Sequence, residues 1–226
     1  MDEEIVRIAE NLCCAIDSYL YDMGYRENPR EAEELVGMLD CDLNDETNNA
    51  VFTELAEKLC NRVLPGLQMF VRDVNLTREL ADKYEEGMIL RHPAFTDASW
   101  RNGGMVTSHR YAILSNHMAD FSVLSGEEDP RGLVVAKLNS RFRVLKIYKS
   151  ASGETMILLL HLPDDGSWPV FAQSTFSVFD DIIDDSIDRF ENRLIEPPVE
   201  ELTDEDWLLR CADPIGFCAD GSLAEP

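Results

Sequence analysis

The stretch LVVAKLNSRFRVLKIYKSASGETMILLLHL, from Leu133 to Leu162, predicts three consecutive β-strands and decides the fold class. Its last run, Met156 to Leu162, is apolar except for His161, which is typical of a strand buried on both faces. The residues from Ala151 to Glu154 form a short turn between two β-prone runs, so residues 142–162 are predicted to form a hairpin. A strand covered on both faces needs helices above and below the sheet.

The middle of this stretch is basic. Residues 131–149 carry six basic side chains and no acidic one. The alternation of polar and apolar residues slips between Val144 and Leu145, which indicates a β-bulge or burial of both faces. A basic strand with aromatic residues can bind nucleic acid, but pairing with the chain's own acidic helices, or protection of a sheet edge, is the favoured interpretation.

Amphipathic helices are expected before the sheet. The segments from Glu3 to Tyr21 and from Thr47 to Leu64 place apolar residues at three- and four-residue spacings. Shorter helices are expected between Asn28 and Leu39 and between Asn75 and Gly87. Residues 1–90 are therefore predicted to form a helical layer.

The most regular helix is expected after the sheet, from about Phe179 to Ile195, and Trp168 to Phe171 is a possible further edge strand. Apolar residues occupy one side of this helix and carboxylates the other: Asp180, Asp181, Asp184, Asp185 and Asp188. Like charges at four-residue spacing repel each other. A surface that is kept for binding cations would carry this mild penalty, so these five aspartates are the predicted partner-binding residues.

Together these patterns predict an α+β fold. An N-terminal helical layer, residues 1–90, would pack on a mainly antiparallel sheet of four to six strands between roughly residues 105 and 171. A C-terminal amphipathic helix would lie on the same sheet. Residues 1–90 and 91–226 are expected to form one compact domain, because a chain of 226 residues with 45% apolar content can bury a large core.

The charge is large and unevenly distributed. The chain carries a formal charge of -24, with 21 acidic and 8 basic residues in 1–90, 6 and 9 in 91–162, and 17 and 3 in 163–226. Such a surface repels nucleic-acid phosphates and attracts cationic proteins. No run of apolar residues is long enough to span a membrane, and the acidic N-terminus does not resemble a secretory signal, so a cytoplasmic location is expected.

No metal or cofactor motif was identified. The cysteines at 13, 14, 41, 60, 211 and 218 form no CxxC pair, and they are expected to be reduced. The acidic loop that begins at Asp40 has Asp45 and Val51 where a calcium loop needs glycine and glutamate. His109 and His117, eight residues apart, lack the spacing of a zinc-binding helix. We therefore expect no metal and no cofactor.

One cluster of basic residues is a candidate anion-binding or catalytic site: Arg91, His92, Arg101, His109, Arg110 and His117. Ser108 lies beside His109, but adjacent residues of a regular strand point to opposite faces. Activation of Ser108 by His109 is therefore not expected, and neither Ser108 nor Ser115 lies in a GxSxG motif. The alternative interpretation is that these are ordinary, partly exposed sheet residues.

Two classes of function remain. The charge favours an acidic binding module that docks or neutralises a basic protein, as toxin immunity proteins do, and no catalytic residue is assigned. The alternative is an enzyme or binding protein for an anionic small molecule, built on the histidine and arginine cluster.

Overall fold

The computed structural model describes residues 67–121, 130–164, 168, 178–218 and 220–224. The chain divides into two compact units, one of Met1–Pro65 with Pro163–Asp180 and the other of Gly66–Leu162 with Asp181–Pro226. The second unit contains the sheet and is described by itself. The helices expected within residues 1–64, and the strand expected from Trp168 to Phe171 apart from Trp168, lie outside the described residues.

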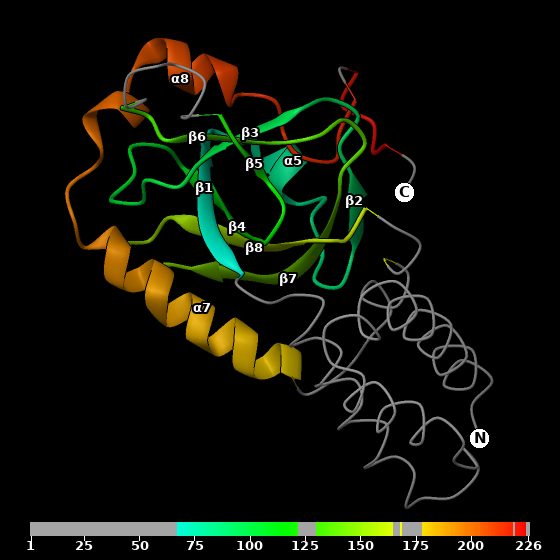
Figure 1. The fold of residues 1–226 in the computed structure, drawn as a ribbon, viewed down its shortest axis with the longest axis horizontal. Helices are drawn as coiled ribbons and strands as arrows, with labels where there is room; N and C mark the ends of the chain where they lie inside the picture. The colour runs from blue at the N-terminus through cyan, green and yellow to red at the C-terminus, as the bar shows by residue number, and fades with distance from the viewer. Residues whose placement is uncertain (1–66, 122–129, 165–167, 169–177, 219, 225–226) are drawn as a thin grey trace, which may run out of the picture. The chain divides into compact units, whose positions relative to one another are not determined.

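Within the residues that the structure describes, eight strands form one mixed sheet in the order β2-β7-β8-β4-β1-β3-β6-β5 (Figure 1). Every neighbouring pair is antiparallel except β4 and β8, which are parallel. The strands are β1 (Gln68–Val74), β2 (Ile89–Arg91), β3 (Thr96–Ser99), β4 (His109–Ser115), β5 (Ala119–Asp120), β6 (Leu133–Ala136), β7 (Arg141–Lys149) and β8 (Thr155–His161).

The stretch that was used to predict the sheet does form three strands, β6, β7 and β8. The β7–β8 hairpin is confirmed, and its register shifts between Val144 and Lys146, at the predicted irregularity. Six of the seven residues of β8 are buried, as expected for a strand covered on both faces. Local pattern was sufficient here because a hairpin pairs residues that are close in sequence.

The predicted fold class is wrong in two respects. In the described part of the chain the sheet already has eight strands and includes a parallel pair, so it is neither four- to six-stranded nor simply antiparallel. It also begins at Gln68, within the segment that was assigned to a helical layer, and β1 lies between β4 and β3. The sequence of β1, QMFVRDV, does not alternate because Arg72 and Asp73 are buried along with its apolar residues.

Few helices accompany the described part of the sheet: α5 (Arg78–Ala81), α7 (Val178–Leu194), α8 (Glu205–Arg210) and the 3₁₀ turn η3 (Glu200–Leu202). The helix predicted near residues 179–195 is α7, on which Phe190 is buried and Asp184, Asp185 and Asp188 are exposed. Glu191 Oε2 accepts a hydrogen bond of 3.1 Å from the backbone N–H of Ala151. This contact joins the C-terminal half of α7 to the β7–β8 turn.

One face of the sheet carries the main apolar core. Alternate residues of the central strands contribute to it, for example Tyr111 and Ile113 of β4 and Ile157 and Leu159 of β8. The hydroxyls of Tyr84 and Tyr111 lie 2.5 Å apart, and the Tyr84 hydroxyl also donates to a backbone carbonyl, so neither buried phenol lacks a partner. This core is densely packed and holds β4 and β8 in place, so the groups at the ends of these strands have fixed positions.

Candidate ligand-binding cavity

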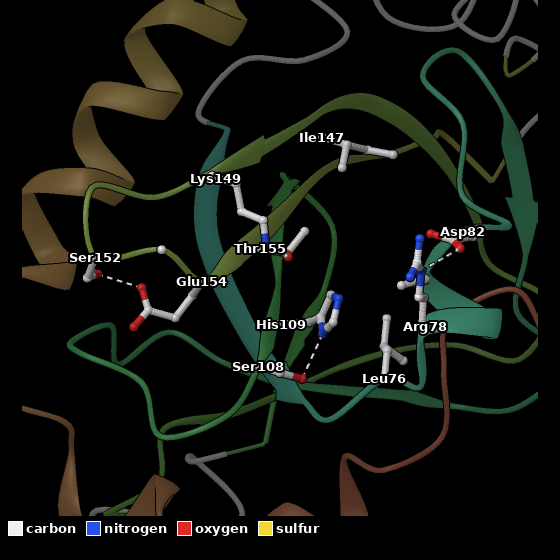
Figure 2. A pocket seen from close by; sticks show the side chains of 12 residues that line it. Leu76, Arg78, Asp82, Ser108, His109, Ile147, Lys149, Ser152, Glu154 and Thr155 are labelled. Atoms are coloured by element: carbon white, nitrogen blue, oxygen red, sulfur yellow. Dashed lines mark hydrogen bonds and ion pairs between the residues drawn. The ribbon is translucent and has the colours of Figure 1, made fainter.

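A cavity of about 700 Å³ opens at the start of β4 and β8, beside α5 and the β7–β8 turn (Figure 2). Its polar side is formed by His109 and by Ser108, Lys149 and Thr155, and Figure 2 shows these three side chains around the His109 ring. Its apolar side is formed by Leu76, Ala81 and Ile147. The combination of an apolar wall and a few convergent polar groups is characteristic of small-molecule sites.

Strand register places three polar side chains of the cavity in one row. His109 of β4 pairs with Thr155 of β8, and Thr155 pairs with Lys149 of β7. Directly paired residues on neighbouring strands project to the same face of the sheet. Lys149 Nζ donates a hydrogen bond of 2.7 Å to Thr155 Oγ1, which fixes the position of the ammonium group in the row.

Ser108 and His109 contact each other, contrary to the prediction that they point apart. Ser108 Oγ lies 2.7 Å from His109 Nδ1, and both residues line the cavity. The prediction was wrong because Ser108 precedes β4, which begins at His109, so the alternation of a regular strand does not apply to it. Its backbone is held outside the strand by a hydrogen bond of 2.9 Å from Ser108 N–H to Asn75 Oδ1.

The imidazole of His109 is electrostatically biased toward its neutral form. Burial lowers the pKa of His109 below its ordinary value of 6.5, and the nearby Lys149 ammonium lowers this pKa further. A neutral imidazole can accept a proton, whereas an imidazolium ion cannot. His109 is therefore a potential proton acceptor at neutral pH.

Charged groups at the rim of the cavity already have partners. Arg78 Nε lies 3.5 Å from Asp82 Oδ2, and both side chains are largely exposed. The Glu154 carboxylate accepts a hydrogen bond of 2.6 Å from Ser150 Oγ, and bonds from Ser150 and Ser152 lower the pKa of Glu154. Lys149 is consequently the cationic group that lies in the same row as His109.

The structure separates the six residues of the predicted cluster. Of these six, His109 alone lines the cavity. Arg110, its neighbour on β4, is 1% exposed and forms a bidentate ion pair with Asp73, with distances of 2.6 and 2.8 Å. Arg110 also donates to Asn102 and to the carbonyl of Gly103, so its guanidinium is hydrogen-bonded to groups of the protein interior.

The other four residues of the cluster lie on different elements. His92, 2% exposed, follows β2, and its Nδ1 accepts a hydrogen bond from the N–H of Gly216. Arg91 Nη1 donates to Asn139 Oδ1, and Arg101 Nη1 lies 3.3 Å from Glu201 Oε2. His117 follows β4 at its far end. The six residues therefore do not converge on one pocket.

The predicted acidic surface is partly described. Asp184, Asp185 and Asp188 are exposed on α7, while the side chains of Asp180 and Asp181 lie outside the described residues. Sequence reasoning did not select Lys149 or Thr155 as site residues. The hairpin pattern could have paired these two with each other, but their alignment with His109 depends on the parallel β4–β8 pair, for which the sequence gives no local signal.

The site is thus an open, mixed polar and apolar cavity at one end of a mixed sheet, an arrangement that is characteristic of small-molecule sites. No family model and no curated protein matches the sequence. Several solved structures of bacterial proteins resemble parts of this fold, and they include ADP-ribosyltransferases, among them a toxin, and a type III effector.

Three of these structures illustrate the similarity. Exoenzyme S from Pseudomonas aeruginosa, in complex with human 14-3-3 protein beta and bound to carba-NAD, has a TM-score of 0.36 and 13% identity, over 69% of this chain and 87% of that chain. The ADP-ribosyltransferase Vis from Vibrio splendidus has a TM-score of 0.34 and 16% identity, over 73% and 87%. HopU1 of Pseudomonas syringae has a TM-score of 0.36 and 14% identity, over 58% and 65%.

The comparisons correct the predicted function. The three structures described above are those of Exoenzyme S and of two ADP-ribosyltransferases, and not of immunity proteins. The prediction of an immunity-like acidic binding module is therefore wrong.

Within the described residues, no helix is both long and apolar enough to cross a membrane.

Proposed function

We propose that the cavity binds a small molecule that carries a phosphate or carboxylate group. The observation that supports this proposal is the row of His109, Thr155 and Lys149 across three adjacent strands, beside an apolar wall. An anion between the His109 ring and the Lys149 ammonium would accept charge-assisted hydrogen bonds from both sides. The apolar wall would receive the uncharged part of the same molecule.

The charge distribution supports an anion at this position despite the acidity of the chain. Residues 91–162, which contribute both His109 and Lys149, are the segment in which basic residues outnumber acidic ones. Charges separated by more than about 8 Å at physiological ionic strength are largely screened. The local ammonium of Lys149 therefore decides anion binding more than the net charge of -24 does.

Anion binding would change the protonation of His109. In the free protein, burial and Lys149 keep the pKa of His109 below 6.5. A bound anion close to the ring favours the imidazolium ion and raises this pKa. Binding is therefore accompanied by proton uptake at a pH near neutrality.

A second function, nucleophilic hydrolysis of an ester, is supported by the distance of 2.7 Å between Ser108 Oγ and His109 Nδ1. In the Nε2–H tautomer, Nδ1 can accept the hydroxyl proton while Oγ attacks an ester carbonyl. The imidazolium would then protonate the departing alcohol, leaving an acyl group on Ser108. Water would release that group with His109 again as the base.

The binding proposal is tested by calorimetric titration of the full chain with inorganic phosphate, AMP and NAD⁺. Replacing Lys149 with Met should weaken binding of inorganic phosphate by about tenfold or more, because a hydrogen bond to a charged group contributes about 1.5 kcal/mol or more. The matched control is Lys146→Met, since Lys146 is on the same strand, pairs with Glu86 and does not line the cavity. Equal loss in both variants would exclude the cavity as the binding site.

The same preparation tests two enzymatic activities. Burst release of p-nitrophenol from p-nitrophenyl acetate, lost in Ser108→Ala, would support ester hydrolysis. ADP-ribosyl transfer, the activity of several matched structures, is tested by nicotinamide release from NAD⁺. Exoenzyme S is bound to a 14-3-3 protein in its structure. For the present chain, a basic protein partner stays a prediction.

A further inference from the structure

A second group of polar residues lies at the far ends of the two parallel strands. Ser115 is the last residue of β4 and His161 is the last residue of β8. The rings of His117 and His161 stack with a centroid distance of 3.9 Å and an interplanar angle of 23°. Phe142 stacks on the His161 ring at 4.9 Å. The buried imidazole is therefore held in a fixed orientation by flat contacts with two rings.

In both His161 and His117, the ring nitrogen Nδ1 takes part in a hydrogen bond. His161 Nδ1 lies 2.8 Å from Ser115 Oγ, and His117 Nδ1 lies 2.8 Å from Asn116 Oδ1. Ser115 Oγ also accepts a hydrogen bond of 3.2 Å from the backbone N–H of His117, which ties the two residues together. Histidines that bind metals characteristically use one ring nitrogen for the metal and the other for such a hydrogen bond.

The other nitrogen of His161 lacks a hydrogen-bond partner. His161 is 1% exposed, and its Nε2 is a buried polar atom with no partner among the described residues. A buried polar atom without a partner is destabilising and needs an explanation, such as an ion that occupies the site. A neutral imidazole keeps a lone pair on one of its two ring nitrogens, and that lone pair can bind a metal ion.

We propose that His117 and His161 together bind a divalent transition-metal ion, with water molecules in the remaining coordination positions. One ring nitrogen of each residue lies within 4.8 Å of the other, and the exposed His117 ring would leave its stacked position to bind the same ion as His161. Imidazole nitrogen favours Zn²⁺, Ni²⁺ and Cu²⁺ over Mg²⁺ and Ca²⁺. The two ligands are 44 residues apart in the sequence and belong to no recognisable metal-binding motif.

This site is separate from the proposed ligand-binding cavity. His109 and Thr155 begin β4 and β8, and Ser115 and His161 end them. A seven-residue strand rises by about 3.3 Å per residue, so the two sites are roughly 20 Å apart. Failure of one proposal consequently leaves the other intact.

The test is titration of the full chain with NiCl₂ and with ZnCl₂, after treatment with a chelator and gel filtration, using calorimetry. We expect one ion per chain for this site, and a raised thermal unfolding midpoint in the presence of the metal. His117→Gln should weaken this binding by at least about tenfold, in line with losses seen when groups that support a metal are removed. Because His117 is exposed, this variant is expected to fold.

Two further measurements make the result decisive. His109→Gln is the matched control, since it removes a histidine at the other end of β4 and should retain the binding of the unaltered chain. In a ¹H–¹⁵N spectrum of the imidazole rings, Ni²⁺ should broaden His117 and His161 before His109. Binding that is unchanged in His117→Gln, or no binding of either metal to the unaltered chain at millimolar concentration, would overturn the proposal.

Discussion

Lys149 and Thr155 face each other across the β7–β8 hairpin, and Lys149 Nζ donates a hydrogen bond of 2.7 Å to Thr155 Oγ1. The same threonine pairs on its other side with His109. Thr155 therefore links the only two nitrogen-bearing side chains of this row and determines how far apart they are held.

Replacement of Thr155 tests this role. Thr155→Val keeps the shape of the side chain but removes the hydroxyl, so the Lys149 ammonium is no longer held in position. We expect the affinity for inorganic phosphate to fall by about threefold to tenfold, equivalent to roughly 0.7–1.4 kcal/mol for a single hydrogen bond. Thr155→Ser, which retains the hydroxyl, should lie close to the unaltered chain in the same calorimetric titration.

The pH dependence of anion binding tests the role of His109. The pKa of His109 is below 6.5 in the free protein, and a bound anion raises it, so the complex takes up a proton. Affinity should therefore increase as the pH falls from about 7.5 toward about 5.5. Sulfate is the suitable probe, because its charge is constant over this range. His109→Gln should abolish the increase, and an unchanged slope in that variant would contradict the assignment.

The buried pair of Arg110 and Asp73 is predicted to be essential for stability and not for ligand binding. The two side chains are 1% and 6% exposed, so removing one leaves an uncompensated buried charge. Arg110→Met should lower the free energy of unfolding by about 3–5 kcal/mol, measured by urea denaturation. The double variant Asp73→Leu with Arg110→Met should lose less than the sum of the two single variants.

Stability at acid pH depends on His92. Burial, followed by the charge of Arg72, lowers the pKa of His92 from 6.5 to about 4. His92 in the unfolded chain binds a proton at a higher pH than His92 in the folded chain. The stability that the neutral His92 gives the folded chain is therefore complete above about pH 6.5 and is lost progressively toward pH 4. This lowering of the His92 pKa corresponds to a loss of roughly 3 kcal/mol in the free energy of unfolding at low pH.

The measurement is urea denaturation of the unaltered chain and of His92→Gln at several pH values. The glutamine can still accept the hydrogen bond from Gly216 but does not titrate. The difference in unfolding free energy between the two chains should therefore shrink or reverse as the pH falls. A difference that is constant with pH would show that His92 does not titrate in this way.

Sequence reasoning succeeded where structure is local. The β7–β8 hairpin, its irregularity at Val144 and helix α7 all depend on residues that are neighbours in the chain. It failed for β1, because Arg72 and Asp73 look like surface residues but are buried. Arg72 donates to the backbone carbonyls of Asp97 and Asp213, and these partners are not apparent from the sequence.

The residues of the candidate site were likewise predicted only in part from the sequence. His109 was selected because it is a histidine in a segment rich in basic residues. Lys149 and Thr155 were missed because only the alignment of β4 with β8 brings them beside His109. The contact of Ser108 with His109 was excluded by assuming that the strand began earlier than it does.

The parallel pairing of β4 with β8 also determines how the chain can fold. Ser115 and His161, which meet at the ends of these strands, are separated by 46 residues, and no hairpin joins the two strands. A chain loop of this length must close before the centre of the sheet can form, and its closure entropy is not repaid until that pairing is complete. Sheets that depend on such distant contacts fold on the order of milliseconds to seconds. The β7–β8 hairpin can form much earlier, and until β4 pairs with it β8 is an unpaired apolar edge, which favours aggregation.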